Sequence, residues 1–248
     1  MARPPPERSG QLLVLRLLPN LVSILALCAG LTAIRFAVAD EFGTAVLLIV
    51  VAAALDGLDG RLARMLDSET EIGAELDSLC DFVNFGVTPA LVLYLWGLEA
   101  EAGWGWGAVL VYAVCCMLRL ARFNVGARAA TEAAEKTTFV GVPSPAGALL
   151  ALVPVYLGFA LDGFAVPPVL VALWMAGIGA LMISRVRTPS LKRLTIAAED
   201  ARYVLVGAVL VVAALLTYPW LTLLALSLGY LAGVLWLALR SLGPGGAR

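Results

Sequence analysis

The sequence predicts an all-α fold, a polytopic membrane helix bundle of about eight transmembrane helices. Three observations lead to this expectation: the composition, the apolar runs and the placement of charge. Hydrophobic residues make up 61% of the 248 residues, charged residues make up 14%, and the mean hydropathy is +0.94. A soluble domain carries about 25% charged residues. The surplus apolar surface is therefore expected to face lipid.

The apolar runs give the number of spans, because crossing a bilayer takes about 20 consecutive apolar residues. Eight runs qualify, at residues 18–39, 43–66, 77–98, 104–124, 145–162, 166–184, 202–217 and 219–240. Arg16, Pro19 and Asn20 interrupt the start of the first run. This interruption argues against a cleaved signal peptide.

The placement of charge supports this count. If the N-terminus is cytoplasmic, all of the 17 Lys and Arg residues except Arg35 fall in cytoplasmic segments. The outer loops carry acidic residues instead, namely Asp40, Glu41, Glu99, Glu101 and Asp162. This positive-inside pattern predicts that both termini are cytoplasmic and that the protein is integral to the cell membrane. We expect residues 1–17 to be a disordered or interfacial lead, residues 18–240 a single transmembrane domain, and residues 241–248 a cytoplasmic tail.

Two residue types limit the chemistry that the chain can perform. Histidine is absent, which excludes a Ser-His-Asp triad and an H-E-x-x-H zinc site. The cysteines Cys28, Cys80, Cys115 and Cys116 lie in apolar runs without zinc-type spacing, so we interpret them as packing residues and expect no disulfides. The net charge of −1 points to no class of partner, and we expect no nucleic acid among the partners.

Aspartates interrupt the second and third apolar runs at helical spacing. One stripe, at i, i+3, i+4, i+7 and i+8, consists of Asp56, Asp59, Gly60, Ala63 and Arg64. A second stripe, at i, i+4 and i+8, consists of Gly73, Asp77 and Asp81. The connection between the two runs is short, so the helices are expected to be antiparallel neighbours whose stripes face each other near the cytoplasmic boundary. Ionisable residues inside a span normally mark function.

Four facing aspartates would repel one another unless cations compensate them. Hard divalent ions with oxygen ligands are suited to this role. Two Mg²⁺ or Mn²⁺ ions about 3.5–4 Å apart can clamp a phosphate or pyrophosphate during displacement. The small residues Gly60, Ala63 and Gly73 would leave room for such a ligand, although packing between helices is another reason for small residues.

The complete string resembles the signature of the CDP-alcohol phosphatidyltransferase family, D-x-x-D-G-x-x-A-R-x(8)-G-x-x-x-D-x-x-x-D. Every fixed position matches, from Asp56 to Asp81. The resemblance implies helices around a cytoplasm-facing cavity, two divalent metal ions and a homodimer. It also implies CDP-diacylglycerol and a small alcohol as substrates. The segments IGAELDSLCDFVNFGVTPA (72–90), LRLARFN (118–124) and FVGVPSPAGA (139–148) resemble the membrane-integral branch that transfers the phosphatidyl group to L-serine.

The resemblance assigns roles to residues in a site that we expect within 19–145. The implied metal ligands are Asp56, Asp59, Asp77 and Asp81, with Asp81 also acting as general base. The implied CDP-binding residues are Asp56, Gly60, Ala63, Arg64 and Gly73, together with Asn20 and Ser23 at the end of the first span. The expected alcohol- or phosphate-binding residues are Arg119, Arg122, Lys136, Asn84 and Ser144.

Alternatives stay open at this point. The acceptor could instead be glycerol-3-phosphate or an inositol phosphate. A cation transporter would also use aspartates inside the membrane, but it would not explain Gly60, Ala63 and Arg64 on the same stripe. The aspartates could also form a structural ion-pair network. Arg119 and Arg122 could be positive-inside anchors that contact anionic lipid, which is how we interpret the basic residues of segment 185–193.

Overall fold

The computed structural model describes residues 7–66, 70–133, 141–161, 164–184 and 201–242. These residues form ten α-helices and no strand, which confirms the predicted all-α class. The helices are α1 (Glu7–Val38), α2 (Phe42–Met65), α3 (Glu71–Asp81), α4 (Thr88–Gly97), α5 (Ala102–Ala133), α6 (Ser144–Ala151), α7 (Val153–Ala160), α8 (Pro168–Ile183), α9 (Ala201–Thr217) and α10 (Pro219–Leu242). A π-helical turn, η1 (Phe82–Val87), joins α3 to α4, and a 3₁₀ turn, η2 (Glu99–Glu101), precedes α5.

The apolar segments coincide with the predicted runs. Among the described residues, five are long and apolar enough to cross a membrane: Leu18–Val38, Phe42–Met65, Glu71–Gly97, Gly103–Gly126 and Pro219–Arg240. Three shorter apolar stretches lie at Ser144–Ala160, Pro168–Ile183 and Leu205–Thr217. The chain is thus a helical membrane protein, while the count of eight spans and the side of the termini stay predictions. Residues 7–17 continue α1 as helix, and the expected disordered or interfacial lead over residues 1–17 stays a prediction.

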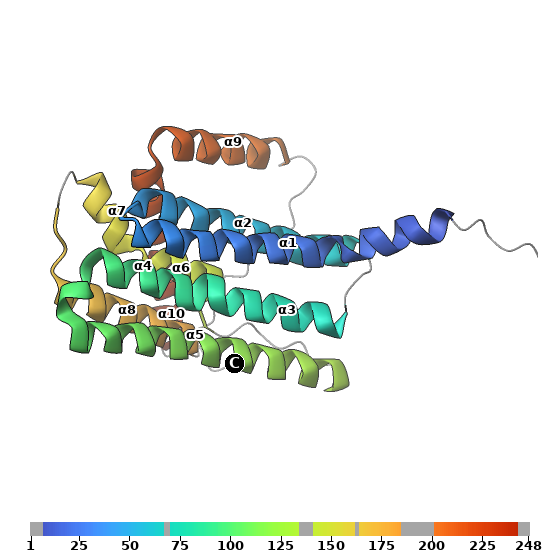
Figure 1. Cartoon of the computed structure of the whole chain (residues 1–248), viewed down its shortest axis with the longest axis horizontal. Coiled ribbons are helices and arrows are strands. Elements are labelled where there is room, and N and C mark those ends of the chain that lie inside the picture. The colour runs from blue at the N-terminus through green and yellow to red at the C-terminus, as the bar shows by residue number, and fades with distance from the viewer. Residues whose placement is uncertain (1–6, 67–69, 134–140, 162–163, 185–200, 243–248) are drawn as a thin grey trace, which may run out of the picture.

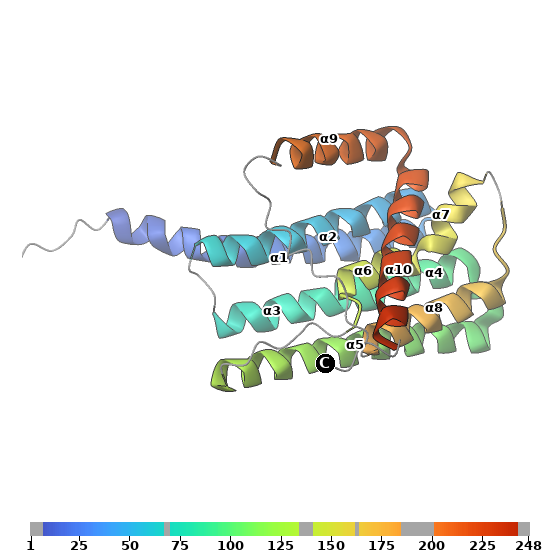
Figure 2. The same cartoon turned by 180° about the vertical axis from the view of Figure 1, so that it is seen from behind.

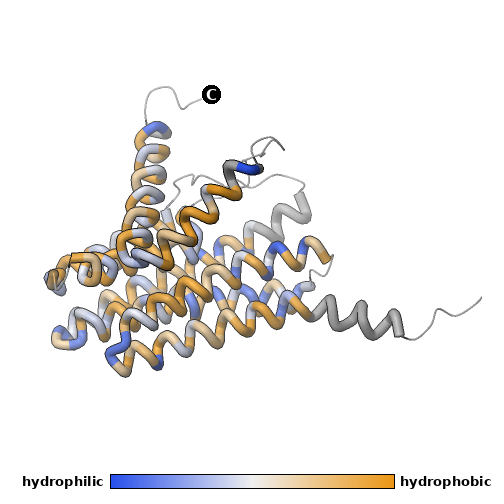
Figure 3. Tube along the Cα trace, turned by 90° about the horizontal axis from the view of Figure 1, so that it is seen from above, coloured by the Kyte–Doolittle hydropathy of each residue, from blue (hydrophilic) through white to orange (hydrophobic). Residues whose placement is uncertain are grey.

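Most of the helices run along one common direction (Figure 1). α1 packs along α2, α5 packs along α8, and the α3–η1–α4 segment contacts both α1 and α5. α10 crosses this bundle steeply, in contact with α6 and α7, and α9 meets α10 at the turn that connects them (Figure 2). Apolar positions extend along the helices, and hydrophilic positions gather toward their ends (Figure 3). This is the distribution expected of a protein whose helix surfaces contact lipid.

A proline explains the π-helical turn. Pro89 has no amide hydrogen, so in an α-helix the carbonyl of Phe85 would lose its donor four residues on. The hydroxyl of Tyr112, on α5, donates a hydrogen bond to the Phe85 oxygen at 3.0 Å. Tyr112 is fully buried. The turn after Asp81 is therefore fixed by a side chain from a neighbouring helix.

The same arrangement occurs a second time, where the predicted run 145–162 divides into α6 and α7. Pro154 removes the amide that would bond to the carbonyl of Leu150. The indole N–H of Trp174, on α8, donates to the Leu150 oxygen at 2.8 Å. The helix breaks at Leu152, between α6 and α7. α8 thus provides the donor that the α6–α7 segment lacks.

Candidate functional site

The two acidic stripes face each other, as the spacing predicts. α2 carries Asp56 and Asp59, α3 carries Asp77, and α1 packs against both helices. One carboxylate oxygen from each of these three residues lies within 4.8 Å of the other two. Asp59 is 4% exposed, and Asp56 and Asp77 are half-buried. Three carboxylates this close repel one another strongly when they are ionised and shielded from water.

The fourth aspartate, Asp81, occupies the end of α3 beside Asp56. The Ser144 hydroxyl donates to Asp81 Oδ2 at 3.2 Å. The other oxygen, Oδ1, is buried and receives no hydrogen bond from a donor group among the described residues, and the Asp56 carboxylate lies within hydrogen-bonding reach of Asp81. An ionised oxygen of this kind needs either a cation or a proton donor.

These residues fit divalent ions. The donor set consists of carboxylate oxygens, which Mg²⁺ and Mn²⁺ prefer. Three of the oxygens converge within 4.8 Å of one another, and Asp81 lies beside Asp56. The described part of the chain therefore contains an acidic cluster able to hold metal, at the position that the sequence predicts.

Ser23 supports this cluster from α1. Its hydroxyl donates to Asp59 Oδ2 at 2.6 Å and lies 3.2 Å from the Pro19 carbonyl oxygen. A hydroxyl has a single hydrogen, and the shorter contact to a carboxylate is the stronger one. Ser23 therefore orients the Asp59 carboxylate. The sequence predicts Ser23 as a nucleotide contact and does not predict its hydrogen bond to Asp59.

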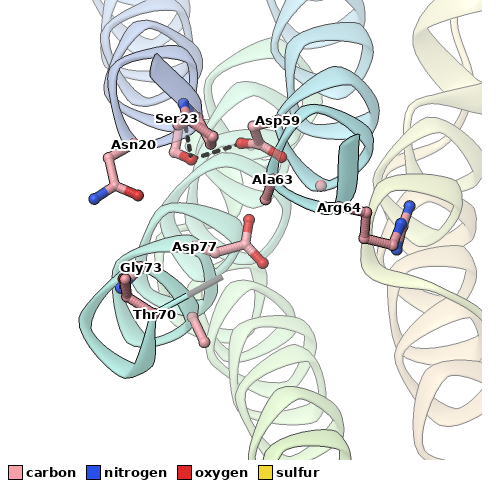
Figure 4. A pocket seen from close by; sticks show the side chains of 11 residues that line it. Asn20, Ser23, Asp59, Ala63, Arg64, Thr70, Gly73 and Asp77 are labelled. Carbon is pink, nitrogen blue, oxygen red and sulfur yellow. Dashed lines mark hydrogen bonds between the residues drawn. The ribbon is translucent and has the colours of Figure 1, made fainter. Parts of the chain in front are cut away.

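A cavity of about 220 Å³ opens beside the cluster, between α1, α2 and the start of α3. Figure 4 shows Asp59 and Asp77 on its walls, with Asn20 and Ser23 on the α1 side. The residues that line it are Pro19, Asn20, Ser23, Asp59, Gly60, Ala63, Arg64, Thr70, Gly73, Ala74 and Asp77. All the residues expected to bind CDP lie on this cavity except Asp56, which belongs to the adjoining cluster.

A side chain is disfavoured at the two motif glycines of the cavity for different reasons. A Cβ atom built on Gly60 would meet no atom within 4 Å, so this glycine keeps the cavity open. A Cβ atom on Gly73 would lie 3.0 Å from Asn20 Oδ1 and 3.0 Å from Thr70 Oγ1. Thr70 caps α3 by accepting a hydrogen bond from the Gly73 amide at 3.0 Å. Gly73 therefore lets α1 approach the start of α3. The Arg64 side chain is directed away from Asp59 and Asp77 (Figure 4).

Of the five residues expected around the acceptor alcohol, the four that the structure describes do not gather in one place. Arg119, on α5, donates to Ser144 Oγ, and Ser144 reaches Asp81. Arg122 is exposed and donates to the carbonyl oxygen of Ile183 at 2.7 Å, at the end of α8. There its charge also suits the negative end of the helix dipole.

Asn84 and Lys136 complete that group. Asn84 is 1% exposed, and its amide lies against Gly30 of α1, where an added Cβ would come 2.1 Å from Asn84 Oδ1. The Asn84 side chain extends from η1 onto α1 and does not line the cavity described above. Lys136 lies outside the described residues, as do the basic residues of segment 185–193. Among the described residues of this group, Ser144 contacts Asp81, and Arg119 contacts Ser144.

Sequence reasoning missed two residues beside the site. Asn124 Nδ2, on α5, donates to Ser78 Oγ at 3.0 Å and so ties α5 to the residue after Asp77. Asn124 is an amide in an apolar helix, and that signal could have identified it. Tyr230, on α10, lies near enough to Arg119 for an electrostatic interaction. No local signal marks Tyr230, because the steep crossing of α10 brings it there.

Comparison with known proteins agrees with this geometry. The family model described as CDP-alcohol phosphatidyltransferase matches residues 16–183, and a second, described as CDP-alcohol phosphatidyltransferase 2, matches residues 203–233. A helical membrane protein with this acidic cluster has the architecture of a membrane enzyme that handles phosphate esters. The chain belongs to the CDP-alcohol phosphatidyltransferase family. The second match covers most of α9 and the first part of α10, which the sequence alone left as generic spans.

Several curated relatives are named CDP-diacylglycerol–serine O-phosphatidyltransferase. The relative from Mycobacterium leprae is 40% identical over 230 residues, which cover 92% of this chain and 76% of that protein. The relative from Mycobacterium tuberculosis is 39% identical over 223 residues, which cover 89% and 77%. The relative from Bacillus subtilis is 33% identical over 177 residues, which cover 71% and 92%.

Proposed function

We propose that this chain transfers the phosphatidyl group of CDP-diacylglycerol to L-serine, which yields phosphatidylserine and CMP. The observation that carries the proposal is the convergence of Asp56, Asp59 and Asp77 within 4.8 Å beside a cavity kept open by Gly60. The names of the mycobacterial and Bacillus relatives support serine as the acceptor.

Two divalent ions, Mg²⁺ or Mn²⁺, would be held by Asp56, Asp59, Asp77 and Asp81. When bound, they would neutralise the carboxylates and the pyrophosphate of the substrate and stabilise the charge that develops at phosphorus. Ser23 would keep the Asp59 carboxylate in its ligating orientation through the 2.6 Å hydrogen bond. Outer hydrogen bonds of this kind typically tune ligand geometry.

The chain's own residues then orient the substrates and move one proton. The nucleotide would occupy the cavity lined by Asn20, Gly60, Ala63 and Arg64, with the acyl chains in the inner leaflet. Asp81 Oδ1 would accept the proton of the serine hydroxyl as its oxygen forms a bond to the phosphorus that carries diacylglycerol. The bond from that phosphorus to the oxygen bridging to CMP breaks, and CMP leaves. Arg119 would balance the acceptor carboxylate or the lipid phosphate.

The proposed site belongs to one membrane domain and faces the cytoplasm. We take residues 18–240 as one catalytic membrane domain, with the site within 19–145 and open to the cytoplasm. The basic residues near the cluster, Arg61 and Arg64, support this orientation through the positive-inside pattern. A homodimer is expected from the family resemblance.

The test is an acceptor panel with purified protein. CMP release is measured with CDP-diacylglycerol and serine, glycerol-3-phosphate or an inositol phosphate, first with Mg²⁺ or Mn²⁺ and then after chelation. We expect release with serine that is lost on chelation. Asp81→Asn is expected to lower kcat by about 10²–10⁴-fold, the usual contribution of a general base. Asp40→Asn is the matched control, because Asp40 lies exposed in the α1–α2 turn at φ 61°, a conformation that asparagine also adopts.

Release with glycerol-3-phosphate but not with serine would overturn the acceptor assignment. Divalent cation flux in liposomes without any CMP release would favour the transporter alternative over the whole proposal. If Asp81→Asn keeps full activity, Asp81 is not the general base.

A further inference from the structure

Ser144 occupies an unusual position for a residue expected to bind the substrate. It is the first residue of α6 and is 0% exposed. Its hydroxyl lies between two charged side chains, Arg119 of α5 on one side and Asp81 of α3 on the other. Three helices that are distant in sequence therefore meet at this one oxygen.

The direction of both hydrogen bonds follows from the chemistry of the groups. A guanidinium only donates, so Ser144 Oγ must accept from Arg119 Nη1. The single hydrogen of the hydroxyl is then left for the other side, where it reaches Asp81 Oδ2. Arg119 thus fixes which way Ser144 points, and Ser144 fixes which oxygen of Asp81 is engaged.

This arrangement leaves the two oxygens of Asp81 unequal. Oδ2 accepts from Ser144, whereas Oδ1 is buried and receives no hydrogen bond from a donor group among the described residues. A guanidinium in direct contact commonly engages both oxygens of a carboxylate at once. A serine between the two charged groups engages only one, and the Asp56 carboxylate is the neighbouring group within hydrogen-bonding reach of Asp81.

The backbone before Ser144 holds it in this place. Gly141 has φ +93°, a conformation that favours glycine. The next amide, of Val142, donates to the carbonyl oxygen of Leu181 at 3.4 Å. The loop that delivers Ser144 is therefore attached to the end of α8.

We propose that Ser144 is a positioning residue that orients the carboxylate of Asp81 and that Arg119 acts on Asp81 through it. This inference rests on the proposed function, because it concerns the group assigned as its base. It also replaces the expectation that Ser144 binds the acceptor alcohol. The two roles differ in a measurable way: loss of a positioning contact lowers kcat, whereas loss of a substrate contact made equally in ground and transition states raises KM.

The experiment compares Ser144→Ala and Ser144→Thr with the wild type, using whichever acceptor supports CMP release. We expect Ser144→Ala to lower kcat by about 10- to 100-fold, the usual effect of losing an outer hydrogen bond to a ligand residue, with little change in KM for the acceptor. Ser144→Thr keeps the hydroxyl and is expected to recover most of kcat. The control is Ser227→Ala, another buried serine, on α10, which is expected to keep wild-type kinetics.

A raised KM with unchanged kcat in Ser144→Ala would overturn the proposal in favour of acceptor binding. Equal losses in the alanine and threonine variants would also overturn it, because the hydroxyl would then not matter. If Ser144→Ala does not fold, Ser144→Cys replaces it, since a thiol is a weak donor and the same fall in kcat is expected. Wild-type CMP release in the same assay tests the proposed function separately from the role of Ser144.

A double-mutant cycle tests the second half of the inference. Arg119→Met is expected to lower kcat in the wild type and to add little to the loss of kcat already caused by Ser144→Ala, whereas the substrate contact proposed for Arg119 would appear in KM. If the two losses multiply in full, Arg119 does not act through Ser144. Mn²⁺ binding, followed by electron paramagnetic resonance, is expected to persist in both single variants, because Asp56, Asp59 and Asp77 form the metal cluster without either residue.

Discussion

Replacing Gly141 with alanine should disturb both the stability of the bundle and the position of Ser144. The glycine lies at φ +93°, which L side chains rarely adopt. A Cβ atom placed there would come 2.4 Å from the carbonyl oxygen of Met182 and 3.1 Å from that of Ser184. Both atoms belong to the backbone at the end of α8, so neither can move aside as a flexible side chain could.

The size of the effect follows from these two contributions. A left-handed conformation costs an alanine about 1–2 kcal/mol, and forcing an extra carbon into packed surroundings costs about 1–3 kcal/mol. Together they amount to roughly 2–5 kcal/mol of unfolding free energy. For a chain of this size each kcal/mol lowers Tm by about 2–4 °C, so a fall of at least about 4 °C is expected. Since the loop must also move away from α8, Ser144 shifts relative to Asp81 and kcat falls.

The assay is thermal unfolding in detergent together with CMP release. Gly177→Ala is the matched control, because Gly177 lies exposed on α8 and an added Cβ meets no atom within 4 Å. Alanine is the better helix former by about 1 kcal/mol, so this variant should melt at or above the wild-type temperature. If Gly141→Ala has the same Tm as Gly177→Ala and keeps the wild-type kcat, the reasoning about this loop is refuted.

Two further substitutions test the packing and the cavity. Tyr112→Phe should destabilise the protein by about 1–3 kcal/mol, because it removes the side-chain donor to the buried Phe85 carbonyl. Tyr156→Phe is the control and should keep the wild-type Tm, since the buried Tyr156 hydroxyl has no partner among the described residues. Equal losses of Tm in the two variants would contradict this reasoning. Gly60→Leu should fill the nucleotide cavity and raise KM for CDP-diacylglycerol by about tenfold or more, equivalent to about 1.4 kcal/mol, without lowering Tm. Gly57→Leu, also in open surroundings but outside the cavity, is its control, and equal kinetics for the two would argue against that cavity as the CDP site.

The sequence predicts the acidic cluster well because helical periodicity is a local property. The i, i+3 and i, i+4 spacings place Asp56, Asp59, Asp77 and Asp81 on faces that no tertiary contact has to rearrange. The apolar runs likewise follow from composition alone, and the helices lie where those runs predict. Two runs divide near prolines: the run at 145–162 breaks at Leu152, before Pro154, and the run at 77–98 contains the π-helical turn before Pro89.

The acceptor side was much less accessible to sequence reasoning. Asn84 follows Asp81 by three residues, as a member of the same α-helical stripe would. The π-helical turn over Phe82–Val87 changes the periodicity there, and the side chain lies against Gly30 of α1. Arg122 shares a face with Arg119 in the sequence, yet it contacts the end of α8. The link from Ser144 to Asp81 joins residues 63 positions apart, and no local pattern encodes it.

The two proline-bearing segments have a consequence for how the bundle responds to its bilayer. Each presents a carbonyl whose usual donor, the amide four residues on, is replaced by a proline, and one side chain of an adjacent helix donates instead, Tyr112 to Phe85 and Trp174 to Leu150. Such a bond is lost as soon as one helix slides along the other. Asp81 and Ser144 therefore keep their depth relative to α5 and α8 when the membrane thickens or thins. The strain of hydrophobic mismatch falls on α9 instead, whose exposed Leu205, Leu210 and Leu216 are held by no comparable link among the described residues.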